Sequence, residues 1–175
     1  MMNVLVYDNR LEGSVPKFDG KVIEAGKHMS LPELVNRLQV IADESKKIGA
    51  IHVMAHGIEE EGVGGYGVLL CKEELTNNTV HMLRPLRGKV DKIVLLVCGA
   101  AQKAQNNTRL DGDGELFCHR LASLTRTWVK ASTVRQHYVI WSWEKSWGTD
   151  FGNWEGDAWW FSPDGRKLKA DMTTY

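Results

Sequence analysis

The sequence predicts a single α/β domain in which a mainly parallel sheet is flanked by helices. Two short apolar runs, residues 51–55 and 93–97, each stop abruptly before a polar residue and a glycine. Runs of this kind are typical of strands that are buried on both faces of a parallel sheet. A helical pattern separates the first of these runs from an earlier apolar run at residues 3–7. Strand, helix and strand in this order predict a right-handed parallel crossover.

Length and composition favour one domain, spanning 1–175, and exclude several classes of partner. Lys plus Arg equals Asp plus Glu at 22 each. The basic excess that marks nucleic-acid and anionic-membrane partners is therefore missing, and we expect neither. Three scattered cysteines favour a reducing compartment over a disulfide scaffold. No secretory signal or membrane-spanning stretch is recognisable, so we expect a cytoplasmic protein.

The N-terminal third is predicted to contain two strands and one helix. Residues 3–7 read as a buried strand that ends at Asp8, and residues 21–24 as a short edge strand. The segment Ser30-Leu31-Pro32-Glu33 combines a capping box with a proline in the first turn, which starts a helix. The residues that follow at helical spacing, up to Gly49, are Leu34, Val35, Leu38, Ile41 and Ala42.

The middle of the chain is predicted to alternate between loops and short elements. Residues 58–67 are rich in acid and glycine, which indicates an exposed loop. Residues 68–71 form a short strand or hairpin arm, and residues 79–86 a short helix or turn. Residues 92–97 form the strand that leads to Cys98.

The C-terminal half is predicted to hold a long loop, a helix and two strands. Residues 99–114 form the loop and residues 133–143 a strand rich in β-branched and aromatic residues. A tryptophan-rich hairpin within residues 145–175, with a Pro163-Asp164-Gly165 turn, is expected to pack on the sheet. Residues 115–130 form an amphipathic helix whose buried face is Leu116, Phe117, Leu121, Leu124 and Val129.

The two central strands point to chemistry, because His56 and Cys98 directly follow them. Reactive groups in open α/β sheets gather outside the carboxyl ends of the strands. If the strands are parallel neighbours, a thiol and an imidazole emerge side by side as nucleophile and base. The backbone N–H groups of Gly57 and Cys98 would then form an oxyanion hole. We expect no cofactor for this chemistry.

Simpler interpretations of the same residues stay open. Cys98 could be a small buried apolar residue, which is a common fate of a free cysteine. His56 could be a loop histidine whose ring is satisfied by backbone groups. His52, four residues before His56, could join it and Cys98 around zinc, but His52 lies inside an apolar run and we expect no metal. Cys71 and Cys118 are expected to be structural thiols.

With these strand ends the chain resembles the caspase-like cysteine peptidases of clan CD. The matching features are Val53-Met54-Ala55-His56-Gly57 and, 42 residues after the histidine, an apolar strand that ends in Cys98. The resemblance implies a three-layer α/β/α fold with a central, mainly parallel sheet. It also implies a cysteine endopeptidase of bacterial type acting on a protein or peptide. Caspases have Gln-Ala-Cys-Arg-Gly at the nucleophile; here Val97 precedes the cysteine and is expected to crowd it.

The resemblance also suggests how substrate is bound. The segment Trp141-Ser142-Trp143-Glu144 is similar to a caspase segment whose arginine binds the substrate's aspartate. Glu144 stands in place of that arginine, so a basic P1 residue (Arg or Lys) is expected, with Trp143 as a wall of the cleft. Asp8 and Asp111 are further candidates for contact with substrate. For Asp111 a calcium site and a solvated capping turn are alternatives.

Two other functions fit the same pattern. The domain could be a catalytically inactive caspase-like module with a binding or regulatory role. It could also be a self-processing domain of a bacterial effector or toxin, using the same dyad on its own chain.

Overall fold

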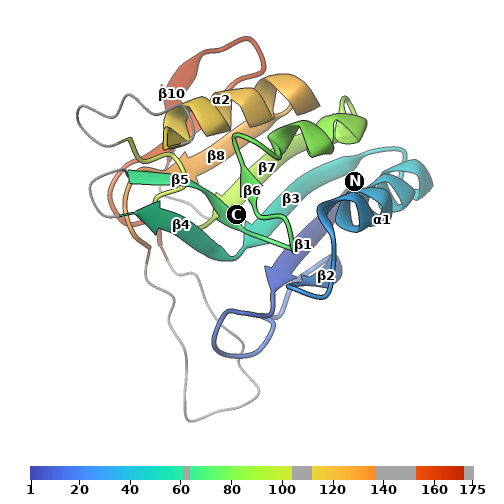
Figure 1. Ribbon diagram of the computed structural model, residues 1–175. Coiled ribbons are helices and arrows are strands. Elements are labelled where there is room, and N and C mark those ends of the chain that lie inside the picture. The colour runs from blue at the N-terminus through green and yellow to red at the C-terminus, as the bar shows by residue number, and fades with distance from the viewer. Residues whose placement is uncertain (61–63, 104–111, 137–152, 172–175) are drawn as a thin grey trace.

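A computed structural model describes residues 1–60, 64–103, 112–136 and 153–171, and it shows an α/β protein built on a mixed, mostly parallel seven-stranded sheet (Figure 1). The strand order is β10-β9-β8-β7-β3-β1-β2, and the five strands from β8 to β2 run parallel. The seven strands are β1 (Met2–Asp8), β2 (Lys21–Ala25), β3 (Ile48–Met54), β7 (Val90–Leu96), β8 (Trp128–Ser132), β9 (Ala158–Phe161) and β10 (Lys167–Lys169).

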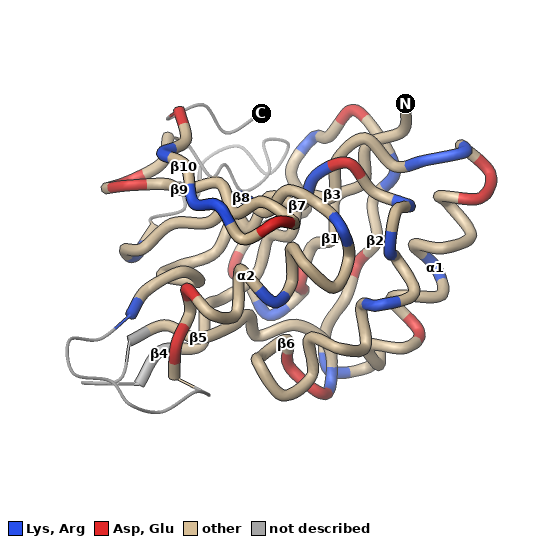
Figure 2. The backbone as a smooth tube through the Cα atoms, turned by 90° about the horizontal axis from the view of Figure 1, so that it is seen from above, with Lys and Arg blue, Asp and Glu red and all other residues tan. Residues whose placement is uncertain are grey.

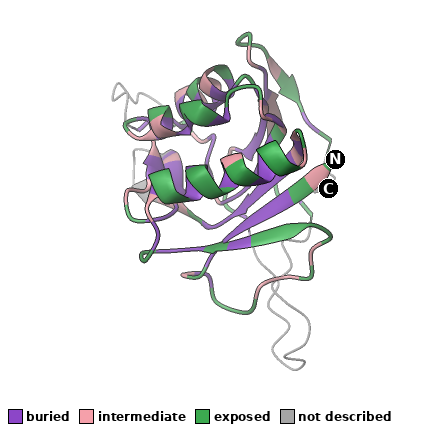
Figure 3. Cartoon of the chain, turned by 90° about the vertical axis from the view of Figure 1, so that its right-hand side faces the viewer, coloured by how far each residue is buried: buried purple, intermediate pink, exposed green. Residues whose placement is uncertain are grey.

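All helices of the described residues cover one face of this sheet. They are α1 (Leu31–Glu44), the 3₁₀ helix η1 (Val80–Leu86) and α2 (Gly114–Thr125). Their buried side chains share one core with alternate strand residues such as Val53 and Leu95, and Figure 3 shows the solvent side of the helices exposed. The other face carries a smaller apolar cluster to which no described helix contributes. A helical layer is thus present on one face, where the three-layer expectation requires two.

The N-terminal expectations are confirmed except at the end of the helix, since α1 stops at Glu44 and Gly49 lies within β3. Helix α1 begins where the capping box predicts, because the side chain of Ser30 accepts a hydrogen bond from the Glu33 N–H at 3.2 Å. Strand β2 lies at the sheet edge beside β1. The crossover from β1 through α1 places β3 beside β1 in parallel. The short helix expected at residues 79–86 is η1.

The loop expected at residues 58–67 is wrong for residues 58–60 and 64–67, which belong to a second sheet. Strands β4 (His56–Glu60), β5 (Gly64–Leu69) and β6 (Leu75–Thr76) form a three-stranded antiparallel sheet. The glycines that suggested a loop instead permit close backbone approach. A Cβ on Gly65 would lie 2.0 Å from the Gly99 carbonyl oxygen, and one on Gly67 2.5 Å from that of Leu75.

The helix expected at residues 115–130 ends earlier than predicted. Helix α2 stops at Thr125, and Arg126 adopts a left-handed conformation with φ 54°. Residues 128–132 then form β8, which ends before the strand expected at residues 133–143, and positions 137–143 of that expected strand lie outside the described residues. The aromatic and β-branched side chains of Trp128 and Val129 suit a strand. Within the described part of residues 133–143, positions 133–136 are not strand.

The C-terminal hairpin forms, but it extends the sheet. Strand β9 pairs antiparallel with β8, and β10 pairs antiparallel with β9. The turn at Pro163-Asp164-Gly165 closes it, with the Gly165 N–H donating to the Ser162 carbonyl at 3.1 Å. None of the helices in the described ranges is long and apolar enough to cross a membrane. Figure 2 shows basic and acidic residues interspersed along the described chain.

Candidate active site

The two strand ends that carry His56 and Cys98 lie side by side. Strands β3 and β7 pair in parallel, with Met54 opposite Leu96. The histidine and the cysteine each follow two residues after these partners. The expectation that both residues leave the sheet at one edge is therefore confirmed.

The backbones after the two strands are in contact at Gly57. A Cβ added there would lie 2.1 Å from the carbonyl oxygen of Cys98 and 3.4 Å from its Cβ. Any side chain other than hydrogen would collide with the Cys98 peptide. Consecutive Cα atoms are about 3.8 Å apart, so the Cα of His56 lies at about that distance from the Cα of Gly57.

The Cys98 thiol is half-buried and sits against the loop that follows β8. Its Sγ lies 3.1 Å from the Gln136 carbonyl oxygen, to which it can donate, and 3.4 Å from the Gln136 N–H, from which it can accept. Gln136 is itself buried, and its amide bridges the Ser132 hydroxyl (2.8 Å) and the Glu155 N–H (2.9 Å). A donor N–H at the sulfur favours the thiolate, whereas the carbonyl favours the thiol.

The chain turns sharply after Cys98. Gly99 has φ 54°, a left-handed conformation that glycine adopts without strain, and its N–H donates to the Val134 carbonyl at 2.8 Å. Val97 is fully buried in the core beneath the helices. Its side chain thus belongs to the core on the helix side of the sheet, and the expected crowding of the thiol stays a prediction.

His56 opens strand β4 and is exposed to solvent. Its cross-strand partner in β5 is Leu69. The carbonyl of Leu69 accepts a hydrogen bond from Arg10 Nη2 at 2.9 Å. The strand that lies beside the histidine is therefore tied to the end of β1. The exposed imidazole belongs to the residue directly before the Gly57–Cys98 contact.

Asp8 does not have the exposed position that contact with substrate needs. It is fully buried at the end of β1, and its oxygens accept from Arg10 Nε at 2.7 Å and Nη2 at 2.6 Å. The hydrogen bond to Asp8 raises the pKa of Arg10 above its ordinary value. Arg10 is the residue that the sequence reasoning missed. A cation two residues after a strand-end aspartate was the available signal.

Three other predicted substrate contacts, Asp111, Trp143 and Glu144, lie outside the described residues. The two remaining cysteines are buried, as expected. Burial raises the pKa of Cys71 to about 12 and raises that of Cys118 still further. Both therefore stay protonated at neutral pH and are poor nucleophiles.

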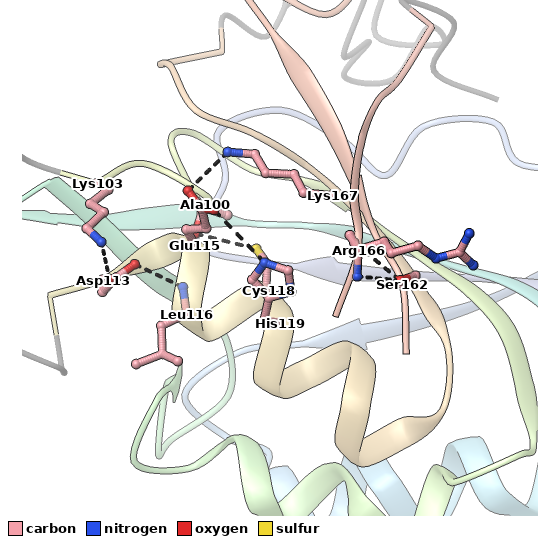
Figure 4. Close-up of polar contacts among 10 residues, drawn as sticks. All are labelled: Ala100, Lys103, Asp113, Glu115, Leu116, Cys118, His119, Ser162, Arg166 and Lys167. Atoms are coloured by element: carbon pink, nitrogen blue, oxygen red, sulfur yellow. Dashed lines mark hydrogen bonds and ion pairs between the residues drawn. The ribbon is translucent and has the colours of Figure 1, made fainter. Parts of the chain in front are cut away.

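Cys118 and His119 form no dyad. The Cys118 thiol faces the Ala100 carbonyl, 3.8 Å away (Figure 4). The His119 ring packs edge-on against Phe161, with ring centroids 5.0 Å apart. The acidic start of α2 serves the helix itself, since an Asp113 oxygen accepts the Leu116 N–H at 2.9 Å. Cys118 and His119 form no dyad because neighbouring residues on a helix point in different directions.

His52 takes no part in the site. His52 lies in β3, whereas His56 lies in β4 of the other sheet, so the two histidines are not on the same strand. The His52 ring packs against Phe18 with centroids 5.5 Å apart. Burial, and then the charge of Lys92, lowers the pKa of His52 to about 4. No group of three or more His, Cys, Asp or Glu among the described residues could hold a metal ion.

Comparison of the chain with family models, curated proteins and solved structures gave no match.

Proposed function

We propose that the protein is a cysteine endopeptidase of caspase-like type, with Cys98 as nucleophile and His56 as acid–base partner. The observation that supports it best is the close contact of Gly57 with the Cys98 peptide. That contact joins the residue after the histidine to the nucleophile, at the sheet edge where α/β proteins place their ligands. The second face, to which no helix of the described residues contributes, is a departure from a three-layer caspase-like fold.

The proposed reaction has two steps. His56 takes the thiol proton, and the Cys98 thiolate attacks the scissile carbonyl carbon to give a tetrahedral oxyanion. The C–N bond then breaks, the amine leaves with the proton from His56, and a thioester remains. Water, with its proton taken by His56, hydrolyses the thioester and frees the thiol. Backbone N–H groups of Gly57 and Cys98 stabilise the oxyanion in this scheme.

Specificity for a basic P1 residue belongs to the same proposal. It rests on Glu144, with Trp143 as a neighbour in the cleft, both from the sequence pattern alone. The natural substrate of the protein would be a cytoplasmic protein or peptide.

One observation favours the alternative of an inactive binding module. The 3.1 Å contact between Cys98 Sγ and the Gln136 carbonyl stabilises the protonated thiol. An enzyme with this ground state must release the contact when substrate binds, whereas an inactive module keeps it.

Active-site labelling tests the proposal. The full chain is treated with peptidyl acyloxymethyl ketones that carry Arg, Lys, Asp or Leu at P1, and the adducts are located by mass spectrometry. We expect modification of Cys98, fastest with Arg or Lys. Loss of His56 in His56→Ala slows it by about 100-fold or more. Cys98→Ala abolishes it, and the matched control Cys118→Ala leaves it unchanged.

Two outcomes of this experiment contradict the proposal in different ways. A clear Asp preference overturns the basic P1 assignment alone. Absence of labelling by every peptide, while iodoacetamide still alkylates Cys98, shows an accessible but inactive thiol and favours the binding module. Fragments that appear when the pure chain is incubated, and that vanish in Cys98→Ala, identify its own chain as a substrate.

A further inference from the structure

The face of the main sheet that no described helix covers has a cavity of about 520 Å³, which is separate from the dyad. Its floor consists of two neighbouring rows of side chains across the strands. One row runs through Asn3, Ala50 and Lys92, and the next through His52, Val94, Lys130 and Trp160. These residues lie before the carboxyl ends of their strands, whereas His56 and Cys98 lie beyond them. The cavity and the candidate active site therefore occupy different parts of the fold.

The cavity is lined by more positive than negative charge. Lys17, Lys92 and Lys130 stand against Asp19 and Asp171, three cations to two anions. The Lys130 side chain is only 3% exposed, and its ammonium lies 3.0 Å from Asp171 Oδ1. Asp171 is 71% exposed, so this buried cation reaches a carboxylate at the rim of the cavity. A carboxylate of the chain already occupies a position where an anion is favourable.

Aromatic rings add flat apolar surface to this charge. Trp160 rises from the floor, with the Lys130 ammonium 5.6 Å from its ring centre. Phe18 comes from the loop before β2 and meets the His52 ring edge-on. Aromatic walls with a few polar groups are typical of small-molecule sites, and a cavity of this size holds a small ligand.

We propose that this cavity binds a small aromatic anion, with its ring beside Trp160 and Phe18 and its charged group toward Lys92 and Lys17. Asp171 forms its ion pair with Lys130. The two exposed lysines, Lys92 on β7 and Lys17 on the loop before β2, supply the positive charge for the ligand. A neutral aromatic ligand would form no ion pair with the lysines, and a small inorganic anion would not bury the aromatic walls. Both parts of the ligand are therefore needed for tight binding.

The proposal is tested by NMR titration of the intact protein with three matched probes: 2-naphthoate, its neutral analogue 2-naphthalenemethanol, and acetate. We expect 2-naphthoate to shift the Trp160 indole and His52 ring signals and to bind about tenfold or more tightly than either fragment, which corresponds to about 1.4 kcal/mol. Bound carboxylate also raises the pKa of His52, because a nearby negative charge favours imidazolium. The charged groups that face His52 in the cavity are Lys17, Asp19, Lys92, Lys130 and Asp171.

Substitution of the rim lysines separates this site from general stickiness. Lys17→Gln with Lys92→Gln should weaken 2-naphthoate by about tenfold or more while leaving 2-naphthalenemethanol unchanged. Lys27→Gln, an exposed lysine outside the cavity, is the matched control and should bind normally. Equal affinity for acid and alcohol, an unaffected double variant with a native spectrum, or no shift at Trp160 and His52 overturns the proposal.

Discussion

At the scale of single residues, the Asp8–Arg10 pair explains how a buried carboxylate is tolerated beside the site. Asp8 is fully enclosed and is held by two arginine donors. The same guanidinium reaches the carbonyls of Leu69 at 2.9 Å and Cys71 at 3.3 Å. It thereby connects the end of β1 to the end of β5, opposite His56. Arg10 is thus a positioning residue for the histidine strand.

Removal of the arginine should be strongly destabilising. Arg10→Gln leaves the Asp8 carboxylate buried without its cation, which costs roughly 3–5 kcal/mol of unfolding free energy. Adding Asp8→Asn removes the stranded charge and should recover part of that loss. Urea unfolding of the single and double variants measures both values. A single variant that is no less stable than the double would contradict this account.

At the scale of elements, three segments converge on the loop that follows β7. A Cβ added to Gly57 would lie 2.1 Å from the carbonyl oxygen of Cys98. A Cβ on Gly65 would lie 2.0 Å from that of Gly99, and a Cβ on Gly114 would lie 2.4 Å from that of Ala100. Strands β4 and β5 and the start of α2 therefore pack backbone to backbone against the cysteine loop. These contacts pack residues 98–100 through backbone and not through long side chains.

Gly57→Ala tests this packing directly. The added methyl group meets backbone rather than a flexible side chain, so β4 must move away from Cys98. We expect a loss of about 1–3 kcal/mol in unfolding free energy, together with slower labelling of Cys98 by the peptidyl reagents.

Gly88→Ala is the contrasting control. Gly88 has φ 75° with open space around it, so alanine there strains the backbone but leaves the site untouched. It should lower stability without slowing labelling. Slower labelling in both variants would show that stability, and not the Gly57 contact, governs the reactivity of Cys98.

At the scale of the whole molecule, the two faces of the sheet differ in chemistry. One is covered by helices and carries the larger apolar core. The other contains His52 and Lys130, both buried, beside a smaller apolar cluster. Because His52 is buried and its pKa is lowered, it should contribute to the pH dependence of the unfolding free energy.

Acidification should destabilise the protein through His52. Its pKa is about 4 in the fold against 6.5 in the unfolded chain, so between these values only the unfolded state takes up the proton. Stability therefore falls as the pH drops from about 6.5 to about 4, by roughly 2–4 kcal/mol, and this contribution then levels off. Urea unfolding across this pH range measures the slope.

His52→Gln is the comparison for that slope, because glutamine does not titrate while the carboxylates act alike in both proteins. The variant should be less sensitive to acid than the natural chain. Parallel curves for the two proteins would show that His52 keeps its ordinary pKa.

Much of the fold follows from local sequence. The capping box at Ser30 and the apolar runs around residues 51–55 and 93–97 identify α1, β3 and β7, because capping and burial on both faces leave a direct pattern. The early end of α2 and the β4–β5 hairpin were missed. There, backbone contacts between distant segments override the composition, as the Gly65–Gly99 approach illustrates.

The sequence by itself determined that a histidine and a cysteine each follow an apolar strand, since an apolar run that stops before such a residue is a local pattern; the fold decided that the two strands are neighbours. Only the tertiary structure decided their surroundings. It enclosed Asp8 with Arg10, placed Val97 in the core and packed Gly57 against Cys98. The physical reason is that burial, ion pairing and close backbone contact join residues far apart in the chain, and no local pattern records them.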